Sequence, residues 1–531
     1  MEGALDRAGL AWWLAPALAM SLVLVAYGGS LDGGWVWDDH LLLQHNPALD
    51  APWRLLTEDL FGPAGVPGND YRPLVMLSFL PGHLLGLGAP FERALALLLH
   101  LLGVALVARL AQALGARNDA AWLGAAVVGV HPGLSEVVLW PSARQDLLPG
   151  LLMVGAALLW TRRRPWLAGL LLALTPFCKE PYLLAPLVLA VWSLGSRRLH
   201  PALLVPSLAS AAYLALRAAL DLPLPLGAAR VALLGAVGAS ARRALGLGLG
   251  ELPPDPLPIF HAAPLVGALA LGAGVALLVA SWGRPRVAVV TGPLLLVVPG
   301  AIAAAQSGLL GDRYLYPGFL AMGVAIALLA SMLNDLRLRA SLWLMPLAFA
   351  GITAAWAPAW GSDLRLFSAA LDHDPGNDHA AFHLAHALHV YQGDCAAAAP
   401  LYARSLDVDP RAATNLQACL VQLGQPAQAL ALTERAAAAA PSNPNPAANG
   451  ARAALATGDL SAATRWATEA VRRDPQDADN RVLLGNILGQ QGQLSPARAQ
   501  FEVALALDPA HAGAAAGIAA CERREAQLRA P

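Results

Sequence analysis

The sequence predicts an all-α protein in which a polytopic helical membrane domain precedes a helical repeat solenoid. Hydrophobic residues make up 57% of the 531 residues and charged residues only 13%. The mean hydropathy is +0.52, whereas soluble globular proteins carry about 25% charged residues. The apolar runs end near residue 358, and a polar helical pattern follows. We therefore predict a membrane domain at 1–361 and a soluble repeat domain at 362–531.

The first apolar run extends from Leu10 to Tyr27 and is long enough to span a bilayer. A cleavable signal peptide, with small residues from Ala15 to Ala19, is the alternative. Cleavage would separate the acidic segment that follows from its anchor. We therefore interpret the run as a retained first transmembrane helix.

Further apolar runs bring the predicted number of spans to about eleven. Two other apolar stretches, 74–90 and 228–250, contain prolines, glycines or arginines, and we assign them to helices lying at the external interface. If both cross the bilayer, the number rises to thirteen. The predicted spans are 10–28, 94–112, 119–132, 145–160, 165–178, 182–195, 200–219, 262–282, 287–305, 317–333 and 340–358.

Arginines in alternate loops predict the orientation. By the positive-inside rule, these loops and the N-terminus lie in the cytoplasm. The large loop 29–93 and the repeat domain then lie outside, with eleven spans or with thirteen. In a chain of bacterial composition the membrane would be the inner membrane. The arginines concerned are Arg109, Arg117, Arg162, Arg163, Arg164, Arg197, Arg198, Arg284, Arg286, Arg337 and Arg339.

Internal repetition predicts the C-terminal architecture. Four glycines recur at intervals of 31, 34 and 34 residues, and each is followed 17 residues later by a proline. This phasing resembles the tetratricopeptide repeat, an antiparallel helix pair of about 34 residues. It predicts four units and a trailing helix over 370–526, with a concave groove along the stack. The positions are Gly393, Gly424, Gly458 and Gly492, and Pro410, Pro441, Pro475 and Pro509.

Cysteine and histidine patterns give no clear metal site. The four cysteines lack metal-binding spacing. Cys395 and Cys419 lie in consecutive repeats and would pair in an oxidising compartment, although we favour two unpaired buried thiols. Four histidines share one helix without a cysteine or carboxylate at a convincing spacing, so a polar helix face is favoured over a metal site. They are His379, His383, His386 and His389.

Acidic, basic and aromatic residues gather in the predicted external loops. Cations there suit a lipid-linked phosphate leaving group. Carboxylates suit deprotonation of an incoming hydroxyl, and aromatic rings suit the interface and stacking on a sugar. The candidate residues are Asp38, Asp39, Tyr71, Arg72, His131, Glu136, Arg144, Lys179, Glu180, Arg313, Tyr314 and Tyr316.

Together with the repeats, five stretches resemble the C-type-fold glycosyltransferases that use polyprenyl-phosphate sugars. Within that superfamily the chain is most similar to the transmembrane and tetratricopeptide-repeat O-mannosyltransferases. The stretches are Trp37-Asp38-Asp39, Tyr71-Arg72-Pro73-Leu74, His131-Pro132 with Glu136 and Arg144-Gln145-Asp146, Lys179-Glu180, and Arg313-Tyr314-Leu315-Tyr316.

The resemblance implies a role for each candidate residue. Asp38 and Asp39 would form the catalytic motif, one as general base and the other positioning the hydroxyl or a divalent metal; which does which stays open. Arg72, Lys179 and Arg313 would contact the donor phosphate. The residues implied to support the substrate site are Tyr71, His131, Glu136, Arg144, Glu180, Tyr314 and Tyr316.

The reaction implied is a single inverting displacement. A sugar would pass from polyprenyl phosphate to an acceptor hydroxyl, expected on a protein serine or threonine, on the external face. The repeat groove would present the acceptor. No cofactor other than a divalent metal is implied, because the lipid-linked sugar is a substrate. Bacteria generally use undecaprenyl carriers, so mannose itself is not implied.

Structural alternatives exist for individual residues. Asp38 and Asp39 could cap a helix, and Arg72 and Arg313 could anchor at the headgroups. Lys179 and Glu180 could pair with each other. His131, before a proline, fits a helix-terminal turn better than a catalytic base. For His100, within an apolar run, a hydrogen-bonded intramembrane position is expected.

Other functional classes fit the sequence less well. A formal net charge of −1 without a basic face argues against nucleic-acid binding. A transporter would place charged or broken helices at the bilayer midplane, whereas these polar motifs lie in loops. A noncatalytic membrane-anchored repeat scaffold explains the C-terminus but not the gathering of charges on one side. Glycosyl transfer is therefore the preferred function.

Overall fold

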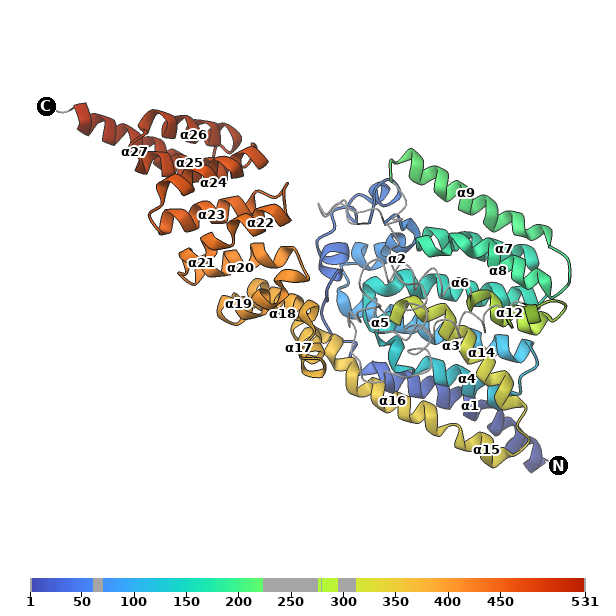
Figure 1. The fold of residues 1–531 in the computed structure, drawn as a ribbon. Helices are drawn as coiled ribbons and strands as arrows, with labels where there is room; N and C mark the ends of the chain where they lie inside the picture. Colours follow the sequence, from blue (N-terminus) through green and yellow to red (C-terminus); the bar gives the residue numbers. More distant parts are fainter. Residues whose placement is uncertain (1, 61–69, 223–275, 278, 295–311, 530–531) are drawn as a thin grey trace. The chain divides into compact units, whose positions relative to one another are not determined.

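The computed structural model describes residues 2–60, 70–222, 276–277, 279–294 and 312–529. Within these ranges every regular element is a helix, as predicted. The chain divides into two compact units, Met1–His373 and Asp374–Pro531 (Figure 1). Helix α17 (Asp363–His373), which precedes the repeats, belongs by its contacts to the first unit.

The first unit is a bundle built around α14. Helix α14 packs on α3, α4 and α6, and α1 packs on α4 and α16. Helices α7, α8, α9 and α12 cover the side of α6 and α14 (Figure 1). The bounds are α1 (Glu2–Gly28), α3 (Ala89–Ala113), α4 (Asn118–Gly129), α6 (Arg144–Thr161), α7 (Pro165–Leu174), α8 (Ala185–Leu194), α9 (Leu204–Ala219), α12 (Pro285–Leu294), α14 (Tyr316–Ser331), α15 (Leu336–Ser341) and α16 (Leu344–Trp356).

Glycines bring the central helices into close contact. A Cβ atom on Gly124 of α4 would overlap the backbone of Gly323 and Ala327 of α14. Likewise, a Cβ on Gly150 of α6 would overlap the ring of Tyr316. Small residues at such positions let helix backbones approach closely, which is how helices associate in lipid.

The bundle has two chemically different ends. At one end, the backbone N–H of Arg117 donates to Ser331 Oγ (3.0 Å), and Arg339 Nε lies 2.9 Å from Asp119. Two of the arginine loops predicted to be cytoplasmic therefore meet there. Helix α3 has 25 residues and is about 37 Å long, at 1.5 Å per residue. It leads away from the opposite end, where the acidic and aromatic motifs lie.

The predicted number of eleven to thirteen spans is too high for the described residues. Three helices are long and apolar enough to cross a membrane: Ala89–Ala113, Pro201–Ala219 and Leu336–Gly361. A fourth results if Asn118–Gly129 and Pro132–Leu139, bent by 61°, are counted as one span. Predicted spans 262–282 and 287–305, and the stretch 228–250, lie wholly or largely outside the described residues.

The physical reason is that an apolar run is not necessarily one helix. The run at 165–178 consists of a ten-residue α-helix followed by a 3-10 turn, Thr175–Phe177. Helix α6 has 18 residues, but its first turn contains Arg144 and Asp146. About 20 residues are needed to cross 30 Å of hydrocarbon. Other apolar helices, such as Pro73–Leu84 and Tyr316–Ser331, are shorter than this.

The first loop is folded rather than extended. It contains a π-helical turn (His40–Gln44), a 3-10 turn (Pro52–Leu56) and α2 (Pro73–Leu84). Of the stretch 74–90 expected as an interfacial helix, α2 covers only residues up to Leu84, and it packs on the 3-10 turn Pro52–Leu56. The buried residues of this small core include Leu42, Leu43, Leu49, Leu55, Val75, Met76 and Phe79.

The second unit contains the predicted repeats. Four helical pairs and a trailing helix, α27 (Ala512–Arg529), follow one another. All four recurring glycines have positive φ, between 67° and 79°, because each ends one helix before the next begins. The pairs are α18 (Asp378–Gln392) with α19 (Cys395–Arg404), α20 (Arg411–Gln422) with α21 (Pro426–Ala431) and α22 (Thr433–Ala439), α23 (Asn445–Ala456) with α24 (Leu460–Arg473), and α25 (Ala478–Gln490) with α26 (Leu494–Leu507).

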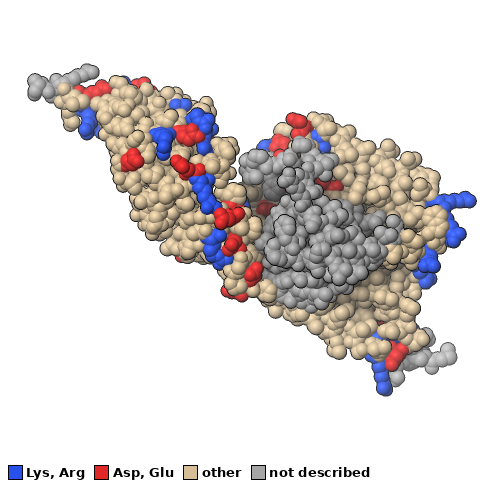
Figure 2. Space-filling model, viewed as in Figure 1, with Lys and Arg blue, Asp and Glu red and all other residues tan. Residues whose placement is uncertain are grey.

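Surface chemistry also differs between the units. On the visible face of the repeats, acidic and basic side chains are interspersed, whereas the visible described surface of the first unit is mostly uncharged (Figure 2). Leu98 and Leu102 of α3 are 62% and 50% exposed. Such exposed apolar side chains are expected where a helix faces lipid.

Candidate functional site

Asp39 is held inside the protein by three hydrogen bonds. Its carboxylate accepts from the backbone N–H of Val36 (3.1 Å), the backbone N–H of Ser142 (2.9 Å) and the Ser142 hydroxyl. The side chain is fully buried. Burial raises the pKa of Asp39 to about 7, although the hydrogen bonds from Ser142 and Val36 act in the opposite direction. Asp39 therefore links the loop 29–93 to the segment that contains Ser142.

Asp38 has the more accessible carboxylate of the pair. It is only partly buried, and its backbone carbonyl accepts the N–H groups that begin the π-helical turn. The preceding residue, Trp37, has a φ of 53°, a conformation that costs energy for a bulky side chain. Asp38 is therefore partly exposed, whereas Asp39 is fully buried.

Asp363 of α17 pairs with His40 beside the turn Trp37–His40, which contains Asp38 and Asp39 and is called the acidic turn below. Asp363 accepts the backbone N–H of Trp37 (2.7 Å) with one oxygen and lies 3.1 Å from His40 Nε2 with the other. Burial lowers the pKa of His40, but its hydrogen bonds to Asp363 and Gln44 outweigh this effect and leave the pKa above the usual value.

Aromatic rings and an arginine cover the other side of the turn. Trp37 stacks on Trp140 with ring centroids 5.0 Å apart, and Trp140 stacks on Trp360. The guanidinium of Arg313 lies 5.0 Å from the Trp140 ring and forms a buried ion pair with Glu136. The predicted residues Glu136 and Arg313 are thus direct partners beside the acidic turn.

Lys179 and Glu180 do not pair with each other. Lys179 Nζ contacts both carboxylate oxygens of Asp146 at 2.7 and 2.6 Å. Glu180 instead accepts from Arg72 (3.0 Å) and from Arg217 (3.3 Å). Two guanidinium groups share this carboxylate, and Arg72 also lies 2.6 Å from Asp70, so two arginines and two carboxylates form one charge-balanced cluster.

One segment connects all these groups. The stretch Glu136–Asp146 binds Arg313 through Glu136, Asp39 through Ser142, Arg72 through Gln145 and Lys179 through Asp146. It comprises the short helix α5 (Ser135–Leu139), a 3-10 turn and the first turn of α6. The predicted stretch that contains Glu136 and Asp146 therefore contacts each of the other four predicted stretches.

Arg144 and Tyr71, two of the predicted site residues, are bonded to other parts of the protein. Arg144 is fully buried and paired with Glu92 of α3. The Tyr71 hydroxyl donates to the Leu56 carbonyl (2.7 Å), while the backbone N–H of Tyr71 donates to Glu180. Burial raises the pKa of Tyr71.

Tyr316 and His131 also make contacts that stabilise the fold. The Tyr316 hydroxyl lies 3.3 Å from His100 in the bundle interior, and His100 also bonds the Gly129 carbonyl. His131 caps a 3-10 turn by accepting from Gly133, as its position before proline suggested. The side chain of Tyr314 lies outside the described residues.

Sequence reasoning missed several partners of the predicted residues, among them Arg217, Ser142 and Asp363. Arg217 carried a signal, because an arginine in the last turn of α9, at a predicted external end, departs from the positive-inside pattern. Ser142 and Asp363 carried none. Their contacts join residues 103 and 326 positions apart, which no local pattern encodes.

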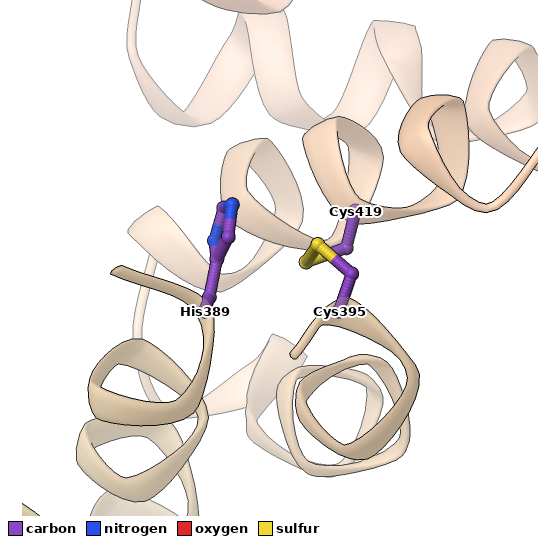
Figure 3. A group of neighbouring side chains, drawn as sticks. All are labelled: His389, Cys395 and Cys419. Atoms are coloured by element: carbon purple, nitrogen blue, oxygen red, sulfur yellow. A yellow bond between two sulfur atoms is a disulfide. The ribbon is translucent and has the colours of Figure 1, made fainter. Parts of the chain in front are cut away.

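The cysteines of the repeat unit form a disulfide. Cys395 and Cys419 are bonded, with Cα atoms 5.0 Å apart, and His389 lies beside them (Figure 3). The favoured interpretation of two free thiols was therefore wrong. The three side chains are close enough to hold a metal ion if the cysteines were thiolates. As a disulfide, the sulfurs link α19 to α20 instead.

The acidic turn differs from that cluster. Among the described residues, no third histidine, cysteine or carboxylate lies within ligand distance of both Asp38 and Asp39. The chemistry that the described side chains themselves offer is proton acceptance by a carboxylate, near arginines and a lysine that are paired with other carboxylates.

The sequence is similar to those of two known proteins. No family model matches the chain. It is 33% identical over 194 residues to the protein O-mannosyl-transferase Tmtc2 of Drosophila melanogaster, covering 32% of this chain and 21% of the relative. It is also 33% identical over 163 residues to human TMTC1, another protein O-mannosyl-transferase, covering 28% and 18%.

The chain resembles the TMTC O-mannosyl-transferases. It spans about a fifth of the length of these curated relatives. Among solved structures, the tetratricopeptide-repeat protein YrrB matches with a TM-score of 0.27 and 20% identity, over 32% of this chain and 88% of its own. Yeast Tom70 matches with a TM-score of 0.26 and 13% identity, over 77% and 92%. TM-scores this low carry no argument about function.

Proposed function

We propose that the protein is a membrane glycosyltransferase that moves a sugar from polyprenyl phosphate to a hydroxyl of a protein acceptor. The observation that carries this proposal is the segment Glu136–Asp146, which joins the acidic turn to the cations at Arg72, Lys179 and Arg313. A proton acceptor and a phosphate-binding region are then adjacent, as glycosyl transfer requires. The resemblance to O-mannosyl-transferases supports the same reaction class.

Asp38 is the proposed general base. A base must reach the acceptor hydroxyl, and Asp38 is the partly exposed carboxylate. Asp39 has a pKa near neutrality, which also suits a base. We nevertheless assign the base to Asp38, because Asp39 is fully buried and both of its carboxylate oxygens already accept hydrogen bonds. Asp39 is therefore proposed to hold the turn that presents Asp38.

Arg72 and Arg313 are the proposed donor-phosphate contacts, because their side chains are 10% exposed, whereas those of Arg217 and Lys179 are 2% and 4% exposed. Negative charge develops on the bridging oxygen as the sugar–phosphate bond breaks, and guanidinium groups stabilise it. Lys179 is enclosed by Asp146 and supports the segment instead. The acceptor oxygen would attack the anomeric carbon while its proton passes to Asp38, so one displacement inverts that carbon.

The disulfide supports an external position for the repeats. Disulfides persist in oxidising compartments such as the bacterial periplasm and are rare in the cytosol. An external repeat unit agrees with the orientation predicted from the arginines. The groove of the repeats would then meet exported protein acceptors, and the surrounding membrane would be a bacterial inner membrane.

The test is transfer by the purified full-length protein in lipid nanodiscs. Polyprenyl-phosphate mannose is the first donor, followed by other polyprenyl-phosphate hexoses, with a serine- and threonine-rich peptide as acceptor. Mass spectrometry should detect a hexose increment on the peptide. Asp38→Asn should lower kcat by about 100-fold or more, in the range of lost general-base catalysis. Repeating the assay with a chelator measures whether a divalent cation is required.

The matched control is Asp372→Asn, which changes an exposed carboxylate in α17. It should leave transfer unchanged. Full activity in Asp38→Asn would remove the base assignment. Absence of transfer from every lipid-linked donor, with the wild-type protein folded and inserted, would favour the noncatalytic scaffold.

A further inference from the structure

The segment between α16 and the repeats is joined closely to the acidic turn. The backbone N–H of Gly34 donates to the Gly361 carbonyl (2.9 Å). Arg93 of α3 donates to the carbonyls of both Gly34 (2.7 Å) and Trp360. A Cβ on Gly33 would lie 3.0 Å from the Gly361 Cα, so the two backbones are in near contact.

Asp363 extends this junction to the residues on either side of Asp38. One carboxylate oxygen accepts from the Trp37 N–H at 2.7 Å and the other lies 3.1 Å from His40 Nε2. The side chain is 8% exposed. As the first residue of α17, it is also stabilised by the helix N-terminus, where a negative charge is favoured.

The strained residue beside Asp38 depends on these contacts. Trp37 has a positive φ, which persists only where surrounding contacts enforce it. Contacts that enforce it include the hydrogen bond to Asp363, the stack on Trp140, an edge contact with Phe367 of α17 at 6.2 Å, and the Arg313 guanidinium 5.9 Å from the Trp37 ring. Two of these four come from α17.

We propose that Asp363 is a positioning residue for Asp38, so that the segment leading into the repeat domain forms part of the catalytic apparatus. This inference rests on the proposed glycosyl transfer. Asp363 does not touch the reacting atoms. It acts by fixing the Trp37–His40 turn, and a shift of about 1 Å in a catalytic group can lower the rate about 100-fold.

The experiment uses the full-length chain with Asp363→Asn and Asp363→Ala. Asparagine retains an oxygen for the Trp37 N–H but loses the ion pair with His40, whereas alanine loses both contacts. We expect kcat to fall in both variants, by about 100-fold for alanine and less for asparagine, with the donor KM unchanged. Asp372→Asn, on the same helix but exposed, is the matched control.

A cycle with His40→Gln separates positioning from general destabilisation. If Asp363 acts through His40, the double variant Asp363→Asn/His40→Gln should lose no more activity than either single variant. Independent, additive losses would overturn this coupling. An unchanged kcat in Asp363→Ala would overturn the proposal itself.

Hydrogen exchange gives a readout that does not require activity. Amides of residues 35–44 should exchange faster in Asp363→Ala than in the wild type, while amides of the bundle core stay protected. Unchanged exchange in 35–44 would refute the junction. If the wild-type protein transfers no sugar, the proposed function fails, but this measurement still decides whether Asp363 holds the turn.

Discussion

Asp38 and Asp39 have the same side chain, yet the fold gives them opposite environments. The carboxylate of Asp39 lies in the protein interior and is met by donors from Val36 and Ser142, whereas Asp38 retains access to the surroundings. A general base must be reached by the acceptor hydroxyl, whereas a side chain that holds a turn in place needs hydrogen bonds to neighbouring segments. Adjacent identical residues can therefore divide these two tasks.

The buried carboxylate predicts a pH dependence of stability. Because the folded-state pKa of Asp39 is raised to about 7, the folded protein binds this proton more tightly than the unfolded chain. The resulting stability is fully present below about pH 4 and is lost as the pH rises through about 7. Its size is on the order of 4 kcal/mol over that range. Asp39→Asn should remove this part of the slope.

Thermal unfolding midpoints in nanodiscs, measured from pH 4 to pH 8, provide the check. The unfolding midpoint of the wild type should fall steadily relative to that of Asp39→Asn between pH 4 and 7, and the difference between the two midpoints should stay constant above pH 7. Asp372→Asn, at an exposed position, should follow the wild type throughout. Parallel curves for wild type and Asp39→Asn would contradict the raised pKa.

At this scale the sequence predicts residue types better than residue partners. Glu136, Arg313 and Arg72 could be singled out because charges are costly near an apolar bundle. That Glu136 pairs with Arg313, or that Arg144 turns away to Glu92, depends on helix packing. Partner identity is a tertiary property.

At the scale of elements, helix ends decide how well a pattern predicts structure. The repeat helices end at glycines with positive φ, so the 34-residue period defines each element directly. In the first unit, hydropathy marks apolar runs but does not show where backbone geometry changes. The break of 61° after α4, between Gly129 and Pro132, falls at the end of the predicted span 119–132.

The repeat glycines allow a matched pair of substitutions. Gly458 has a φ of 79°, so Gly458→Ala should destabilise the protein by roughly 1–2 kcal/mol. Gly489 lies within α25, and a Cβ there would meet Ala497 at an ordinary 3.9 Å. Gly489→Ala should therefore be neutral or stabilising, since alanine is the better helix former. Chemical denaturation followed by circular dichroism measures both.

Equal destabilisation by the two substitutions would show that helix interiors and turns tolerate alanine alike. That outcome would contradict the role assigned to the left-handed glycines.

At the scale of the whole molecule, two independent features support the proposed orientation in the membrane. Arginine loops meet at one end of the bundle, around Asp119 and Ser331, and the acidic turn lies at the other. The Cys395–Cys419 disulfide calls for an oxidising compartment around the repeats. The expected arrangement has the arginine end in the cytoplasm and both the acidic turn and the repeats outside.

Protease treatment of spheroplasts tests this arrangement. Trypsin added outside should digest the repeat unit beyond Asp374 while the Arg162–Arg164 loop stays intact until detergent is added. Under non-reducing conditions, the peptides containing Cys395 and Cys419 should be recovered as one linked species. Protection of the repeats in intact spheroplasts would reverse the orientation.

The contact between Gly124 and Gly323 has an evolutionary consequence. Because a methyl group on Gly124 would overlap α14, neither helix can accept a larger residue there without moving the other. Helix α4 leads into the segment that contains Glu136, and α14 follows the turn that contains Arg313. Substitutions at positions 124 and 323 should therefore covary among related sequences.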